Sequence, residues 1–151
     1  MSKNKFKKYE PKSFEAASTG KYIDSNGTVR VDTFARIYQS MLDSKAFLSL
    51  NDKQKVLYLY AKTALYGARK PKADKSYKEM GVFQGEEYFY FNWAEAKKRG
   101  LYKESMASNF YKDMRSLEEH GLIEKVASGK QQRKKNVYKF SSKWQQWPEK
   151  I

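Results

Sequence analysis

The sequence contains no cysteine and a single histidine, and these two shortages exclude several kinds of site. Without cysteine there are neither disulfides nor thiolate ligands, and one histidine among scattered carboxylates does not make the ligand cluster of a metal site. Rolling-circle initiators and relaxases pair a nucleophilic tyrosine with metal-binding histidines, which this chain lacks. No glycine-rich phosphate loop stands beside a Lys-Ser/Thr pair. We therefore expect no catalytic residues, no metal, no cofactor and no enzymatic activity.

Long hydrophobic runs are also missing. No apolar stretch approaches the ~20 residues of a membrane-spanning helix, and the lysine-rich segment at residues 1–8 lacks the apolar centre of a signal peptide. We therefore expect a cytoplasmic protein without a membrane partner.

Acidic residues are scarce relative to basic ones. The 31 lysines and arginines against 17 aspartates and glutamates give a net charge of +14, a balance that favours a polyanion such as nucleic acid as partner. The 151 residues, 40% of them hydrophobic, are enough for one domain with a real core and too few for a second large one.

Composition divides the chain into a domain with two tails. Residues 1–20 are rich in lysine and poor in apolar side chains, which predicts a flexible basic tail, either a basic arm on phosphate or a solvated segment. The domain is expected over residues 21–147, with a short tail at 148–151. It includes a basic loop at 68–87, whose length leaves open a short strand or a function of its own. Near its start, Asn26-Gly27 between β-prone residues indicates a hairpin.

Two helical segments are predicted next. Apolar residues recur at helical spacing from Phe34 to Leu42, which predicts a helix there, and a second short turn follows Asp43-Ser44. A longer helix, capped by Asn51 or Asp52, carries a broad apolar face and ends at Gly67.

The centre of the chain, residues 88–140, begins with an aromatic strand at Tyr88–Phe91. Asn92 then starts a helix that Gly100 stops, and a turn leads to a second, longer helix. The apolar residues of this second helix fall at spacings of four, four and three, which is a single stripe on the 3.6-residue period. The stripe consists of Met106, Phe110, Met114 and Leu117.

The second helix is expected to end at His120-Gly121, where the histidine is a capping residue and the glycine tolerates a positive φ. Two β-prone runs, Leu122–Ala127 and Asn136–Phe140, then enclose a polar, basic tip. Helix, turn, helix and basic hairpin form a plan suited to DNA binding, although the same scaffold also serves protein contacts.

Two segments carry a resemblance to a known family. Residues 89–100, FYFNWAEAKKRG, and residues 114–124, MRSLEEHGLIE, are similar to winged-helix proteins of bacterial plasmids, phages and conjugative elements, including replication-initiator-like and regulator-like ones. The similarity covers about residues 34–144. From Gly100 to Leu117 the chain is about one helical turn longer than the family pattern, which leaves the start of the recognition helix open.

The resemblance implies a mainly α fold with a small β-hairpin, that is, an α+β winged helix-turn-helix with an extra N-terminal helix. The implied function is sequence-specific or structure-guided binding of duplex DNA, in replication or transcription control of a mobile genetic element. Its partners would be double-stranded DNA, replication or transcription proteins of the host, and, as one alternative, a second copy of the chain.

The expected DNA-binding residues fall into three groups. With Phe110 in the core, the opposite side of the second helix presents donors suited to phosphates and base edges, with the hairpin tip and the end of the first helix beside them. The recognition-helix set is Ser105, Ser108, Asn109, Lys112 and Arg115; the wing set is Lys130, Gln131, Gln132, Arg133, Lys134 and Lys135; the DNA-backbone set is Lys97, Lys98, Arg99 and Lys103. Arg115 has an alternative as the partner of Glu118 or Glu119 in a surface ion pair.

Other functions are weaker alternatives. A non-enzymatic module for protein assembly would use the same scaffold, and RNA binding lacks the strand-borne pair of stacking aromatics that reads single strands. At the C-terminus, Trp144 and Trp147 are expected on one face of a last turn that Ser141-Ser142 caps, sealing the core or making a dimer contact.

Overall fold

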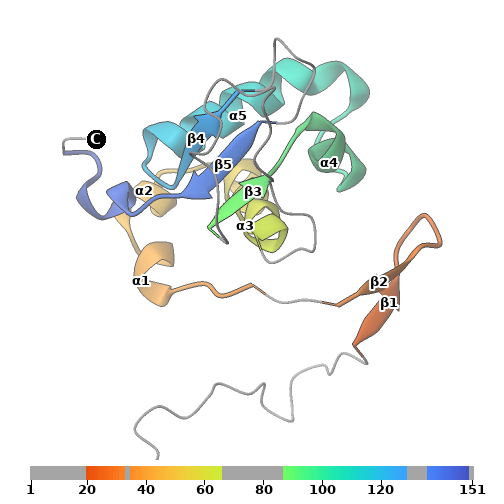
Figure 1. Ribbon diagram of the computed structural model, residues 1–151. Helices are drawn as coiled ribbons and strands as arrows, with labels where there is room; N and C mark the ends of the chain where they lie inside the picture. Colours follow the sequence, from red (N-terminus) through yellow and green to blue (C-terminus); the bar gives the residue numbers. More distant parts are fainter. Residues whose placement is uncertain (1–19, 33–34, 66–86, 129–135, 150–151) are drawn as a thin grey trace, which may run out of the picture. The chain divides into compact units, whose positions relative to one another are not determined.

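The computed structural model describes residues 20–32, 35–65, 87–128 and 136–149, and these form a mixed α+β structure (Figure 1). The described residues contain five α-helices and two small antiparallel sheets, one of two strands and one of three. The α+β class expected from the sequence is therefore confirmed.

The chain divides into two compact units, residues 1–33 and 34–151. The N-terminal hairpin, which we expected inside a domain at 21–147, belongs to the first of them. The expected flexible tail at 1–20 and the basic loop at 68–87 lie outside the described residues except for Gly20 and Glu87.

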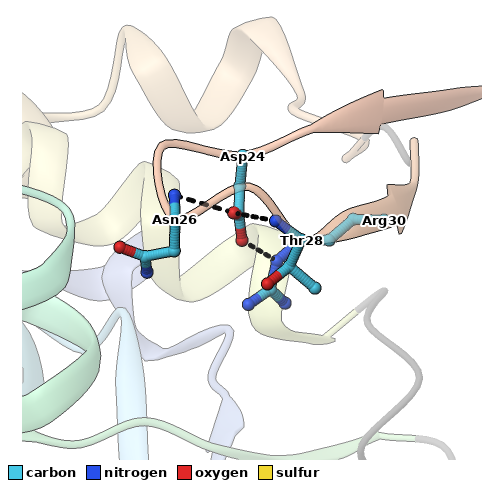
Figure 2. A network of polar contacts seen from close by, with 4 residues as sticks. All are labelled: Asp24, Asn26, Thr28 and Arg30. Carbon is cyan, nitrogen blue, oxygen red and sulfur yellow. Dashed lines mark hydrogen bonds and ion pairs between the residues drawn. The ribbon is translucent and has the colours of Figure 1, made fainter.

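The hairpin of the first unit is organised around one aspartate. Strand β1 (Lys21–Ile23) pairs antiparallel with β2 (Val29–Val31), as the Asn-Gly pair predicted. Figure 2 shows how the Asp24 carboxylate accepts hydrogen bonds from the backbone N–H groups of Asn26 and Thr28, both at 2.9 Å, and from the Arg30 guanidinium. An aspartate that bonds its own turn replaces ladder hydrogen bonds missing from the loop.

These contacts predict an unusual titration for Asp24. The Arg30 hydrogen bond, with the amides of Thr28 and Asn26, lowers the pKa of the carboxyl from 3.8 to about 2. Because the pKa is lowered by folding, the hairpin is stabilised by this carboxylate above pH ~4 and loses that contribution as pH falls through about 2.

An NMR pH titration of the Asp24 carboxyl should therefore give a midpoint near 2, and Arg30→Ala should move it toward 3.8. Arg36→Ala, which removes an exposed arginine of the other unit, is the matched control and should leave the midpoint unchanged. A parent midpoint near 3.8 would contradict the role given to Arg30.

The first two helices of the second unit are single turns. Helix α1 is confined to Gln39–Leu42, so the predicted helix from Phe34 is wrong over residues 35–38, while Phe34 itself lies outside the described residues. The residue before α1, Tyr38, is extended, makes no capping hydrogen bond and is 67% exposed. Helical spacing failed here because the two large apolar side chains of that stretch, Ile37 and Tyr38, are exposed and are not held on a buried face by the residues that the structure describes. The second short turn is confirmed as α2 (Lys45–Leu48), capped by Ser44.

Helix α3 (Asp52–Leu65) starts at a reciprocal cap, and Asn51 is the capping residue. The Asn51 side chain accepts from the Gln54 amide at 2.9 Å, and the Gln54 side chain accepts from the Asn51 amide at 3.1 Å. Two backbone donors at the helix start are thus satisfied. The helix buries Leu57, Tyr58 and Ala61.

A three-stranded sheet holds the rest of the second unit together. Its strands β3 (Tyr88–Tyr90), β4 (Ile123–Ala127) and β5 (Val137–Phe140) lie in the order β3-β5-β4, all antiparallel. Phe89 stacks on Phe140 with ring centroids 4.7 Å apart, and Phe89 is completely buried. The main core gathers side chains of α3, β3, β4 and the two helices between β3 and β4.

Those two helices begin and end largely as predicted. Helix α4 (Trp93–Lys98) is capped by Asn92, which accepts from the Glu95 amide at 2.9 Å. A 3-10 turn, η1 (Glu104–Met106), precedes helix α5 (Ala107–Glu119).

Helix α5 ends in a Schellman motif, the hydrogen-bond pattern that closes a helix with a left-handed residue. Gly121 has φ +75°, its amide donates to the Glu118 carbonyl at 2.9 Å, and the Leu122 amide donates to the Leu117 carbonyl at 3.0 Å. His120 is the C-cap residue, as predicted, and its Nδ1 lies 2.7 Å from the Ser116 carbonyl oxygen.

The C-terminal turn ends one residue earlier than predicted, so that Trp147 lies just outside it. The turn is a 3-10 helix, η3 (Lys143–Gln146), and the Ser141 hydroxyl accepts from the Lys143 amide at 3.1 Å. Trp144 packs against the main core, whereas Trp147 leaves the turn in an extended conformation and stacks on the His120 ring at 4.6 Å. The turn thus ends at Gln146, and the two indoles contact different partners, the main core for Trp144 and the His120 ring for Trp147.

Candidate nucleic-acid interface

Helix α5 has one buried and one exposed side, in the phase that the sequence predicted. Phe110, Met114 and Leu117 are buried, with at most 3% of each side chain exposed. The opposite side carries Ser108, Asn109, Lys112 and Arg115, all four of them exposed. These are hydroxyl, amide, ammonium and guanidinium groups on a rigid element, which can donate hydrogen bonds to phosphates and base edges.

Ser105 does not share the geometry of the other four. It lies in the 3-10 turn η1 and not on α5, because Met106, with φ −107° and ψ 26°, interrupts the α-helical backbone. Its side chain is exposed. Ser105 was placed on the exposed side of α5 by continuing the α-helical period of that helix back to it. That placement on α5 is wrong, because a 3-10 turn has fewer residues per turn than an α-helix.

Within the described residues no ion pair joins Arg115 to Glu118 or Glu119, the alternative that the sequence left open. Instead, the Glu118 carboxylate accepts a hydrogen bond from the Lys125 backbone amide at 3.0 Å. That bond ties the flank of α5 to strand β4. The Arg115 guanidinium is thereby left exposed on the outer side of α5.

The residues expected to meet the DNA backbone divide into two kinds. Lys97 forms an ion pair with Glu104 at 3.0 Å, and the Arg99 guanidinium lies over the Tyr60 ring, 5.5 Å from its centroid. Lys98 and Lys103 are exposed and, among the described residues, join no ion pair. Surface ion pairs are weak, so Lys97 can exchange Glu104 for a DNA phosphate and keeps its predicted role as a backbone contact.

One carboxylate fixes α5 relative to its neighbours. Asp113 accepts from the Gln54 amide side chain of α3 at 3.0 Å and from the Tyr102 hydroxyl at 2.6 Å. Burial, together with the Asp113 carboxylate, raises the pKa of Tyr102 well above its usual range, so this hydroxyl keeps its proton and its bond. The role of Asp113 was missed from sequence, where it counted only as one acidic residue of the helix.

On the other flank α5 faces the hairpin of β4 and β5. Tyr111 is 49% exposed there, with its ring edge against Phe110 at 5.1 Å. Tyr138 of β5 is buried, which raises the pKa of its hydroxyl to about 12, and the Asn136 side chain donates to that hydroxyl at 3.4 Å. Tyr111, an aromatic residue outside the apolar stripe, was not among the predicted site residues.

The hairpin tip itself lies outside the described residues. The strands on either side of it are placed as predicted, with β4 and β5 paired through Ile123 and Phe140 at the far end. The wing residues expected to bind DNA, none of which the structure describes, are Lys130, Gln131, Gln132, Arg133, Lys134 and Lys135.

A surface hollow of about 610 Å³ lies between the start of α3 and the exposed side of α5. It brings two of the predicted recognition residues, Asn109 and Lys112, together with residues that precede and begin α3. The hollow is lined by Asn51, Asp52, Lys53, Asn109, Lys112 and Asp113. Lys53, Asn51 and Asp52 were not predicted as part of a site, because they are distant from α5 in sequence.

In the part of the chain that the structure describes, no helix is both long and apolar enough to cross a membrane. The same residues contain no group of three or more histidine or acidic side chains arranged to hold a metal ion. Comparisons of this chain with known protein families, with curated proteins and with solved structures return no match.

Proposed function

We propose that this chain is a winged-helix protein that binds duplex DNA, with α5 as the recognition helix and the β4–β5 hairpin as the wing. The element order α3, β3, α4, α5, β4, β5 and the sheet order β3-β5-β4 both support this assignment. The single-turn helices α1 and α2 would be the N-terminal addition.

One observation carries the proposal. The exposed side of α5 is built from Ser108, Asn109, Lys112 and Arg115, while its other side is locked into the core by Phe110. A helix that is rigidly held and presents amide and guanidinium groups is suited to the major groove, where asparagine pairs with adenine and arginine with guanine. The net charge of +14 supplies the sequence-independent attraction to phosphate.

The biological setting follows from the resemblance of residues 89–100 and 114–124 alone. On that basis the DNA binding would serve replication or transcription control of a mobile genetic element, in the cytoplasm and alongside host replication or transcription proteins. The alternative, a non-enzymatic assembly module on the same scaffold, would use α5 without any preference among DNA sequences.

A base-preference profile of α5 variants tests the proposal. Asn109→Ala and Arg115→Ala should each relax discrimination at one base position, by ~1–3 kcal/mol, because each removes a side chain able to make a bidentate base contact. The profile is measured by selection from random duplexes and compared with that of the parent.

Arg99→Ala is the matched control, since it also removes an exposed arginine but one expected to meet only phosphate. It should weaken binding to all sequences alike. If both Asn109→Ala and Arg115→Ala keep every base preference of the parent while the fold is intact, this side of α5 does not contact the bases. The proposed recognition face would then be wrong.

A further inference from the structure

Helix α5 has structural elements on both of its flanks. On one flank Glu118 bonds the backbone of β4, and on the other Asp113 bonds Gln54 near the start of α3. A helix that enters the major groove runs between two phosphate backbones, one along each wall. The predicted wing accounts for one wall, and the start of α3 is the element next to the other.

Lys53 is the cationic side chain at that position. It is exposed, its ammonium lies 5.0 Å from the centroid of the Tyr102 ring, and it lines the same hollow as Asn109 and Lys112. Tyr102 is itself buried and bonded to Asp113. A cation–π contact with the Tyr102 ring therefore favours a position of the Lys53 ammonium beside the exposed side of α5.

Two of the backbone donors at the start of α3 are already satisfied, because Asn51 and Gln54 cap each other. The group that carries a full positive charge at this position is the Lys53 side chain, so we assign the contact to an anion to it. Two acids also line the hollow. The Asp113 carboxylate is held by two donors, whereas Asp52 is exposed and would oppose an incoming phosphate.

We infer that Lys53 contacts a DNA phosphate on the α3 side of the recognition helix, and that Asp52 weakens this contact. The inference rests on the proposed function, because it assumes that α5 occupies the major groove. It adds a positioning contact to the interface, one that affects affinity equally for every sequence, in contrast to Asn109.

The test measures binding of duplex DNA as a function of salt for three single variants of the full chain. Lys53→Ala should weaken binding ~5- to 10-fold near 0.1 M salt, lower the slope of log K against log salt by ~0.9 and leave base preferences unchanged. Lys55→Ala is the matched control. It removes the same charge from the same helix, but its ammonium lies 5.7 Å from the Phe47 ring centroid, and it does not line the hollow. Its effect should stay below ~2-fold.

Asp52→Asn should strengthen binding, since it removes the opposing charge while keeping a similar shape. Thermal unfolding of each variant confirms that α3 is intact. Opposite effects of Lys53→Ala and Asp52→Asn, with Lys55→Ala near the parent, support the inference. If Lys53→Ala and Lys55→Ala are indistinguishable while the parent binds duplex DNA, the Lys53 contact is wrong and the proposed function stands. If the parent does not bind duplex DNA, the proposed function fails and the inference with it.

Discussion

Gly121→Ala should lower the free energy of unfolding by roughly 2–5 kcal/mol. Two independent penalties act at this position. Gly121 has φ +75°, a left-handed conformation that costs an L-residue roughly 1–2 kcal/mol. A β-carbon there would also lie 2.6 Å from the Trp144 nitrogen and 2.7 Å from the Lys143 carbonyl carbon.

Both of those atoms belong to the backbone, so they cannot rotate away as the end of a side chain could. The turn η3 would have to move off the end of α5, and the hydrogen bond from the Trp144 amide to the Gly121 carbonyl, at 3.0 Å, would be disturbed. Overpacking of this kind costs roughly 1–3 kcal/mol.

Gly100→Ala is the matched control, measured by the same denaturant titration. Gly100 ends α4 with a similar φ of +78°, but a β-carbon built on it meets no atom within 4 Å. It should therefore show the conformational penalty alone, roughly 1–2 kcal/mol. Equal losses for the two variants would contradict the close approach of η3 to Gly121.

Several features of α5 could be predicted from sequence because they are local. The stripe of Phe110, Met114 and Leu117 is buried as its spacing predicted, and His120-Gly121 ends the helix as that pair of residues indicated. Asn92 likewise caps α4 by accepting a hydrogen bond from the amide of Glu95, three residues later. In each case the residue and its partner are within a helical turn of each other, so sequence spacing contains the needed information.

The failures came where a partner from another element decides the outcome. The apolar spacing from Phe34 to Leu42 matched a helix, yet only Met41 of that stretch is buried among the described residues. Periodicity shows which side chains could share a face, and says nothing about whether another element covers that face.

The hollow between α3 and α5, and the Asp113 carboxylate that joins the two helices, could not be predicted for the same reason. Asp113 bonds Gln54, which lies 59 positions earlier in the sequence, and no local pattern connects the two. Lys53 enters the candidate site only through that packing. Asp24, in contrast, could have been found from sequence, because an aspartate two residues before Asn-Gly is well placed to bond its own turn.

Duplex-DNA affinity should depend very steeply on salt. If roughly six to ten basic side chains meet phosphates, the association constant should fall by ~10³ or more between about 50 and 200 mM salt, because each contact releases condensed counterions. The candidate residues on α4, α5 and the wing are enough to supply such a number. The largest single part of the expected effect would come from the wing, with four basic residues among Lys130–Lys135.

Two double variants separate the contribution of α5 to the salt dependence of binding from the effect of net charge alone. The double variant Lys112→Ala with Arg115→Ala removes two exposed charges of the proposed recognition face, and should reduce the salt slope by ~2 if both meet phosphate or base. The double variant Lys45→Ala with Lys55→Ala removes the same charge elsewhere, from the exposed side of α2 and from a position of α3 where the ammonium lies over Phe47. It should change the slope far less.

The most direct test of the central claim is a salt titration of the parent protein with a duplex DNA and with a single-stranded RNA of the same length. Proposed winged-helix binding predicts tighter binding of the duplex and a fall in its affinity of ~10³ or more between about 50 and 200 mM salt. A flat salt response with the duplex, or stronger binding of the single-stranded RNA throughout the titration, would contradict it.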